Sequence, residues 1–123
     1  MTISGTLIAE SMRVGASVAN LPMRVVKISR EDAGDVSVGQ PSAWTFLAFK
    51  MPDEHADALA TALGDALSET GGWYCDFRSA DETFVVFAGR VFRYRRGDAA
   101  ARAGAEEFGR SVGVPEAQLD WPE

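Results

Sequence analysis

The segment Trp73–Arg96, WYCDFRSADETFVVFAGRVFRYRR, constrains the fold of this chain more than any other stretch. Its β-branched and aromatic residues gather in three short runs, which is typical of strands. The polar segment 79–82 and the dipeptide Gly89-Arg90 separate these runs, and both are typical of tight connections. We therefore predict three consecutive antiparallel strands at 73–78, 83–88 and 91–95.

The connections also predict which side chains share a face of the sheet. A type II′ turn at Gly89-Arg90 places Phe87 opposite Phe92, and the loop at 79–82 places Arg78 opposite Thr83. Opposed residues lie on the same face, and side chains alternate along each strand. One predicted face carries Trp73, Cys75, Phe77, Phe84, Val86, Ala88, Val91, Arg93 and Arg95. The other carries Tyr74, Asp76, Arg78, Thr83, Val85, Phe87, Phe92, Tyr94 and Arg96.

Two apolar stripes at helical spacing predict two helices, at about 53–70 and 98–112. Asp53 and Asp98 stand where a capping side chain is favoured, and Gly71-Gly72 is suited to end the first helix. The stripes consist of Ala56, Leu59, Ala60, Leu63 and Leu67 in the first helix and Ala101, Ala105, Phe108 and Val112 in the second. We expect Leu63, Leu67, Phe84, Val86 and Phe108 in the core.

The remaining segments complete a single α+β domain over residues 1–123. Strands are predicted at 23–29 and 44–49, whereas Thr6–Ala9 fits either a short strand or the start of a helix. The polar segment 31–42 is rich in Asp, Gly and Ser and is predicted to be a mobile loop. Trp121 in the C-terminal tail should pack back on the domain. We predict a largely antiparallel sheet of about five strands with both helices packed on one face.

Composition narrows the function classes. With 123 residues, of which 46% are hydrophobic and 24% charged, the chain is typical of a globular domain. No apolar run approaches the roughly 20 residues of a membrane helix, and we see no signal-peptide pattern. A single cysteine excludes an internal disulfide, so a cytoplasmic location is expected. Arginines alternate with aromatic residues at 90–96, but a net charge of −6 argues against nucleic-acid binding.

Candidate catalytic and metal-binding residues are few. His55 and Cys75 are the only residues of their types, so we expect no zinc site and no cofactor. We interpret Cys75 as a buried apolar residue and His55 as an exposed one rather than as a catalytic pair. Asp76 with Asp120 or Glu82 would provide paired carboxylates for acid–base chemistry, although spacing alone does not bring them together. We predict no catalytic residue, and an enzyme assembled by folding stays open.

Four runs of the C-terminal half resemble a pattern in a family of small, uncharacterised bacterial proteins that includes actinomycete members. They are GWYCDF (Gly72–Phe77), FVVFAGRVFRY (Phe84–Tyr94), RGD (Arg96–Asp98) and GVPEAQLDW (Gly113–Trp121). The resemblance implies a stand-alone bacterial domain and carries over no activity, substrate or site. Defence or immunity gene clusters are one setting for such a domain, and no residue of the chain selects that setting.

The second predicted face is the candidate binding surface, because aromatic residues and arginine dominate binding hot spots. Its members are Tyr74, Asp76, Arg78, Phe87, Phe92, Tyr94 and Arg96. Aligned rings are costly to leave in water, so the N-terminal 20 residues, a second copy or a partner should cover them. We expect a non-enzymatic binding module with a protein partner or a homodimer. The alternative is a small-molecule-binding protein or small enzyme with a pocket near Tyr74 and Asp76.

Overall fold

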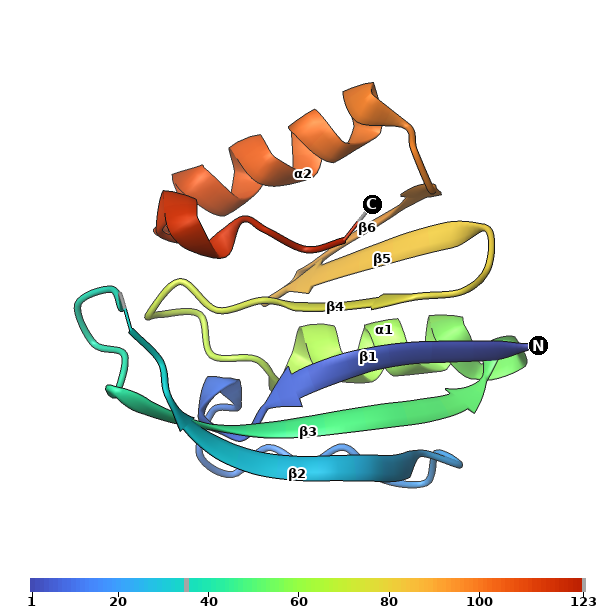
Figure 1. The fold of residues 1–123 in the computed structure, drawn as a ribbon, viewed down its shortest axis with the longest axis horizontal. Helices are drawn as coiled ribbons and strands as arrows, with labels where there is room; N and C mark the ends of the chain where they lie inside the picture. Colours follow the sequence, from blue (N-terminus) through green and yellow to red (C-terminus); the bar gives the residue numbers. More distant parts are fainter. Residues whose placement is uncertain (35, 123) are drawn as a thin grey trace.

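The computed structural model describes residues 1–34 and 36–122 and consists of one antiparallel sheet and two helices (Figure 1). Among these residues the sheet has six strands in the order β2-β3-β1-β4-β5-β6. The strands are β1 (Thr2–Ile8), β2 (Arg24–Asp32), β3 (Ala43–Pro52), β4 (Cys75–Arg78), β5 (Glu82–Phe87) and β6 (Arg90–Arg95). The helices are α1 (Ala56–Ala66) and α2 (Ala99–Ser111). This confirms the α+β class with an antiparallel sheet, with one strand more than predicted.

The additional strand is β1, which resolves the ambiguity left by the sequence near Thr6–Ala9. It pairs with β3 along its length and with β4 near its start, so it occupies the middle of the sheet. Ile3 and Leu7 are buried on one side, as the alternation of a strand requires. A central position between two partners stabilises this segment although it contains Gly5, which weakens a strand.

The two helices cover opposite faces of the sheet, so the prediction that both pack on one face is wrong. Phe84 and Val86 of β5 belong to the buried cluster that contains Leu63 of α1. Val85 and Phe87, which point the other way, belong to the cluster that contains Ala105 of α2. Because β5 is apolar on both faces, each face needs its own cover.

The helix boundaries differ from the prediction mainly at α1. A 3-10 turn at Asp53–His55 precedes α1, and Asp53 makes no capping hydrogen bond. The helix already ends before Leu67, which is extended and pairs with Met12. At α2 the predicted cap is confirmed, because the Asp98 side chain accepts a hydrogen bond from the Ala101 N–H at 3.0 Å.

The strand register keeps the two predicted faces but corrects the second hairpin. Arg78 lies opposite Thr83 as predicted, whereas Phe92 lies opposite Val85 rather than Phe87. The connecting residues are Ala88-Gly89 instead of Gly89-Arg90, and Gly89 takes a φ of +73° at the second position. A register change of two residues returns every side chain to the same face.

The loop between β2 and β3 is shorter than the predicted segment 31–42, because Glu31 and Asp32 belong to β2. Gln40 is buried and exchanges two side-chain hydrogen bonds with Gln118, at 3.1 and 3.4 Å. The Ser37 hydroxyl donates to the Gly71 carbonyl oxygen at 2.8 Å. These contacts join the loop to the segment before β4 and to the C-terminal tail. Asp35 lies outside the described residues, and the mobility of the loop stays a prediction.

Substitution of Leu63 tests the packing of α1 against the sheet. It is completely buried against the sheet, so Leu63→Ala should lower the free energy of unfolding by about 2–5 kcal/mol. Val14→Ala is a suitable control because Val14 is fully exposed, and it should change stability by less than about 0.5 kcal/mol. Chemical denaturation of the three proteins measures both effects. Equal midpoints for Leu63→Ala and the unaltered chain would contradict this packing.

Candidate functional site

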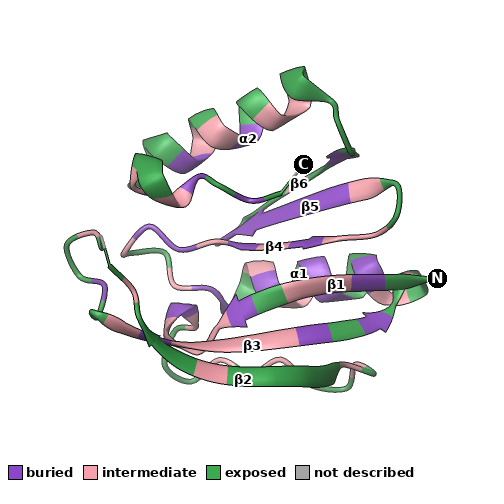
Figure 2. Ribbon diagram, in the orientation of Figure 1, coloured by how far each residue is buried: buried purple, intermediate pink, exposed green. Residues whose placement is uncertain are grey.

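The predicted binding face is largely covered by the protein's own C-terminal half (Figure 2). Phe87 and Tyr94 are only 1% and 7% exposed, because α2 and the tail after it lie over them. Trp121 is buried as predicted, and its indole N–H donates to the Tyr94 hydroxyl at 2.7 Å. The cover is therefore the C-terminal segment and not the N-terminal 20 residues.

The other five predicted site residues fall into two groups. The first group is Phe92 and Arg96, on β6 and just after it. Phe92 is half-buried against the Phe108 ring, with 5.6 Å between ring centroids. Arg96 lies at the far rim, where its guanidinium donates to the Ser79 carbonyl oxygen at 3.2 Å. The second group is Tyr74, Asp76 and Arg78 on or next to β4. Of the seven predicted residues, Tyr74 and Asp76 line the cavity of about 410 Å³ described next.

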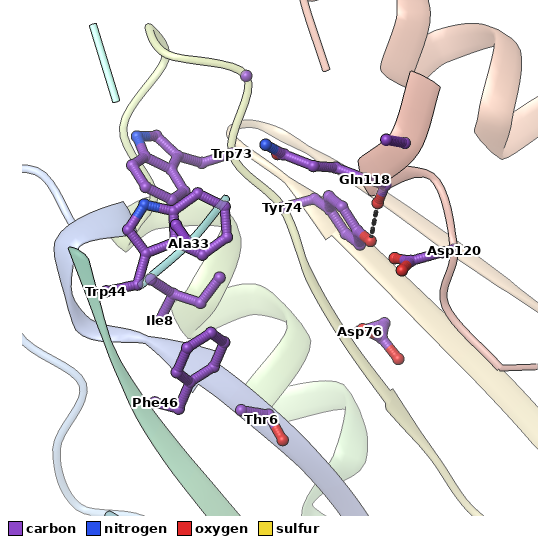
Figure 3. Close-up of a pocket in the computed structure, with 12 residues that line it drawn as sticks. Thr6, Ile8, Ala33, Trp44, Phe46, Trp73, Tyr74, Asp76, Gln118 and Asp120 are labelled. Carbon is purple, nitrogen blue, oxygen red and sulfur yellow. Dashed lines mark hydrogen bonds between the residues drawn. The ribbon is translucent and has the colours of Figure 1, made fainter. Parts of the chain in front are cut away.

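This cavity has a volume of about 410 Å³, within the range of small-molecule sites (Figure 3). It lies where β1 and β4 separate. In the described chain the two strands pair at only two positions, Ser4 with Arg78 and Gly5 with Phe77. The cavity begins beyond these pairs, and side chains of both strands line it together with β3 and the C-terminal tail. The lining residues are Thr6, Ile8, Ala33, Trp44, Phe46, Gly72, Trp73, Tyr74, Asp76, Ala117, Gln118 and Asp120.

Gly5 fixes the point at which the two strands touch. A Cβ atom at this position would lie 2.6 Å from the Asp76 carbonyl oxygen and 2.7 Å from the Phe77 Cβ. Both distances are shorter than van der Waals contact, so only glycine permits the approach. The close contact at Gly5 thus sets where β4 leaves β1 and where the cavity starts.

One wall of the cavity is aromatic and apolar. Figure 3 shows Trp44, Ile8 and Phe46 on one side of the space, with Trp73 beside Trp44. The two indole rings have centroids 5.1 Å apart and planes inclined by 58°, so they present differently oriented faces. The Trp44 N–H donates to the Pro41 carbonyl oxygen at 2.8 Å, which fixes the orientation of that ring.

The opposite wall is polar and acidic. Tyr74, Asp76 and Asp120 point into the cavity from β4 and the tail (Figure 3). The Tyr74 hydroxyl donates to the Gln118 carbonyl oxygen. Burial, reinforced by the charge of Asp76, raises the pKa of Tyr74, so the phenol stays neutral.

Asp76 is the electrostatically unusual residue of the site. Burial raises the pKa of its carboxyl group to about 6, and the charge of Asp120 acts in the same direction. Arg78 opposes this effect, but its Nη1 lies 3.9 Å from Oδ2, too long for a hydrogen bond. The charge of Arg102 also lowers the pKa of Asp76. The carboxylate pair Asp76–Asp120, left open by the sequence, is therefore brought to one cavity.

The structure gives no support to a Cys–His site. Cys75 is buried on the α1 side of the sheet, away from the cavity, and burial raises the pKa of its thiol. Its Sγ donates to the Thr6 carbonyl oxygen at 3.5 Å. No group of three or more His, Cys, Asp or Glu residues suited to a metal ion occurs among residues 1–34 and 36–122.

The aromatic wall was missed by sequence reasoning. The sequence predicts a strand at 44–49 without a site role for Trp44 or Phe46, and it places Trp73 on the opposite face from Tyr74. Trp73 instead precedes β4, so the alternation that defined the predicted faces does not apply to it. The signal that was available is the spacing of Trp44 and Phe46, which places both rings on one side of β3.

Comparisons with models of protein families, with curated proteins and with solved structures found no match. The resemblance of the C-terminal half to small bacterial proteins therefore stays a prediction. Within the described part of the chain, neither helix has the length and apolar character needed to cross a membrane.

The raised pKa of Asp76 predicts a specific pH dependence of stability. Because the folded-state value of about 6 exceeds the usual 3.8, ionisation of Asp76 destabilises the native state. This loss of stability is absent below about pH 4, grows between pH 4 and 6, and is complete above pH 6. Asp76→Asn should therefore raise the free energy of unfolding by about 1–3 kcal/mol at pH 7 and change it little at pH 4.

Denaturant titrations at pH 4 and pH 7 measure this difference. Asp81→Asn serves as the matched control, because Asp81 is exposed in the turn before β5 and should show no such pH dependence. A constant offset between Asp76→Asn and the unaltered chain at both pH values would refute the electrostatic origin of the effect.

Proposed function

We propose that this protein binds a small organic cation, an ammonium group on an apolar or aromatic body, in the cavity between β1, β4 and the C-terminal tail. The observation that carries the proposal is the arrangement of the two walls. Aromatic rings of Trp44, Trp73 and Phe46 lie on one side of the space, and the carboxylates of Asp76 and Asp120 lie on the other. We propose binding alone, without a chemical reaction.

The aromatic wall suits the ligand in two ways. Apolar ring surface gains free energy when a ligand removes it from water. The ring faces also carry negative electrostatic potential, and an ammonium group over an indole gains about 0.5–2 kcal/mol. Trp44 and Trp73 both line the cavity, so a compact cation in it lies beside both indoles.

The acidic wall selects the charge of the ligand. An anion would meet two carboxylates, whereas a cation stabilises the ionised form of Asp76 and offsets the cost of its burial. The net charge of −6 also favours the approach of cations. A neutral ligand would gain the aromatic contacts alone.

The cavity favours the small-molecule alternative over a protein-interaction module that uses the aromatic and arginine face. That face depends on Phe87 and Tyr94, which are buried beneath α2 and the tail. Tyr74 and Asp76 keep a functional role in the proposal, now as parts of a concave site.

Titration with organic cations tests the proposal. Choline and benzyltrimethylammonium are the probes, and 3,3-dimethylbutanol, the neutral carbon analogue of choline, is the control. Trp44 and Trp73 line the cavity, so intrinsic fluorescence reports occupancy and calorimetry gives the affinity. We expect saturable binding of the cations at pH 7.5 and at least about tenfold weaker binding of the neutral analogue, a difference of about 1.4 kcal/mol.

The affinity for the cation should fall as pH decreases through about 6, because protonation of Asp76 removes the negative charge. Asp76→Asn should weaken binding at pH 7.5 by about tenfold or more and abolish this pH dependence. Asp81→Asn should bind like the unaltered chain. Equal affinities for choline and 3,3-dimethylbutanol, or unchanged binding by Asp76→Asn, would contradict the proposal.

A further inference from the structure

The strand β2 forms one edge of the sheet, and in the described residues it pairs with β3 only. It is nine residues long, and its apolar side chains are unusually open to solvent. Ile28 is 67% exposed, and Val25 and Val26 are 45% and 46% exposed. A long edge strand with exposed apolar side chains is a template for pairing with another strand.

The charged residues of β2 indicate which strand can pair with this edge. Arg24 and Lys27 lie in its first half, and Glu31 and Asp32 end it. Arg30 precedes these acids and is paired with Glu10, with its Nη1 3.1 Å from Oε2. When such a strand pairs with a copy of itself in antiparallel orientation, Lys27 of each copy can face Glu31 of the other. Opposite charges on opposed residues stabilise a strand pair, and like charges destabilise it.

We propose that two copies of this chain associate through β2, edge to edge and antiparallel, about a two-fold axis. The pairing with β3 places Lys27, Ser29 and Glu31 on one face, opposite Ala48, Phe46 and Trp44 respectively. With the axis at Ser29, Lys27 of each copy lies opposite Glu31 of the other. The two sheets then form one continuous sheet, and the interface is the same patch on both copies.

The β-bulge in β2 fits this register. The pairing with β3 shifts between Val25 and Lys27, so the strand is irregular at Val26 and regular from Lys27 to Asp32. Bulges limit pairing at exposed edges. A dimer centred on Ser29 pairs Lys27 to Glu31 of each copy, which lie in the regular part of the strand, and leaves Val25 and Val26 outside the pairing.

The opposite edge of the sheet does not offer the same fit. The strand β6 carries Arg90, Arg93 and Arg95 and contains no acidic residue. Self-pairing there would bring arginines together. Arg93 is already engaged, with Nη1 2.7 Å from an Asp57 oxygen and Nη2 2.8 Å from a Glu82 oxygen. Charge therefore favours pairing at β2 and opposes it at β6.

The dimer is independent of the proposed ligand, but it places the two ligand cavities in a defined relation. A second hollow of about 270 Å³ lies over the sheet between the cavity and the β2 edge. Lys27, Ser29 and Glu31 line its outer end, and it shares Thr6 and Phe46 with the cavity. In the dimer, the hollows of the two copies face each other across the axis.

Charge reversal at the β2 edge tests the dimer by sedimentation equilibrium of the full chain. We expect a dimer at about 100 μM protein. Lys27→Glu and Glu31→Lys should each weaken association by about tenfold or more, because each places like charges opposite one another. The double variant Lys27→Glu/Glu31→Lys restores opposite charges and should restore the dimer.

Lys50→Glu is the matched control, because it makes the same charge change on an exposed residue of β3 rather than at the edge. It should dimerise like the unaltered chain. A monomer at all concentrations up to about 100 μM would overturn the proposal. Equal association of the single and double variants would overturn the assigned charge pairing.

Cysteine cross-linking tests the register. Ser29 lies on the proposed axis, so Ser29→Cys should form a disulfide with its own copy under mild oxidation, since paired strands bring opposed Cα atoms within bridging distance. Ile28→Cys and Arg30→Cys are the comparisons and should cross-link more slowly. The native Cys75 is buried and should not compete. Faster cross-linking of Ile28→Cys or Arg30→Cys than of Ser29→Cys would overturn the register.

Discussion

The burial of β5 on both faces is the constraint on which the rest of this structure depends. Residues 83–87 are all buried, so the two sides of this strand form two separate cores. The helix α1 supplies one cover and α2 the other. The second cover is completed by the tail after α2, in which Leu119 and Trp121 are buried against the sheet. Gly109 permits this return, because a Cβ there would lie 2.8 Å from a Leu119 methyl carbon.

The cavity exists because α2 and the tail after it cover only part of this face of the sheet. The tail extends as far as β4, where Gln118 and Asp120 meet Tyr74. Beyond β4, side chains of β1 and β3 on the same face have no helix above them in the described chain (Figure 1). The aromatic residues of β3 thus lie at the boundary between the covered and the open half of the sheet, which is where the space remains.

Much of the local structure could be predicted from sequence, because it depends on local patterns. The faces of β4 to β6 follow from alternation, and the register change at Ala88-Gly89 leaves them intact. The Asp98 cap follows from residue type. The face covered by each helix could not be predicted, because an apolar stripe shows that a helix is packed but not against which side. The apolar residues on both faces of Phe84–Phe87 indicate that each face of this strand needs an element packed against it.

The site was less predictable, because it depends on strand order. Trp44 and Phe46 lie across β1 from Tyr74, because β1 from the start of the chain inserts between β3 and β4. Nothing local in these segments specifies that insertion. The predicted face of Tyr74 and Asp76 depends only on alternation along one segment, so it could be derived without the strand order. The aromatic wall required knowledge of the neighbours of β4.

Asp76 gives the clearest indication of what the site requires. Its ionised form is destabilised by burial, and neither Arg78 nor Arg102 compensates fully, since its pKa remains raised to about 6. Arg102 also contacts other groups, with its guanidinium 4.9 Å from the Trp121 ring centroid and its Nε 3.2 Å from a Glu106 oxygen, whereas its buried Nη1 makes no hydrogen bond in the described chain. An asparagine at position 76 would avoid the cost of ionisation. A carboxylate whose charge the fold only partly neutralises, opposite a wall of aromatic rings, is the arrangement on which the proposal of a cationic ligand rests.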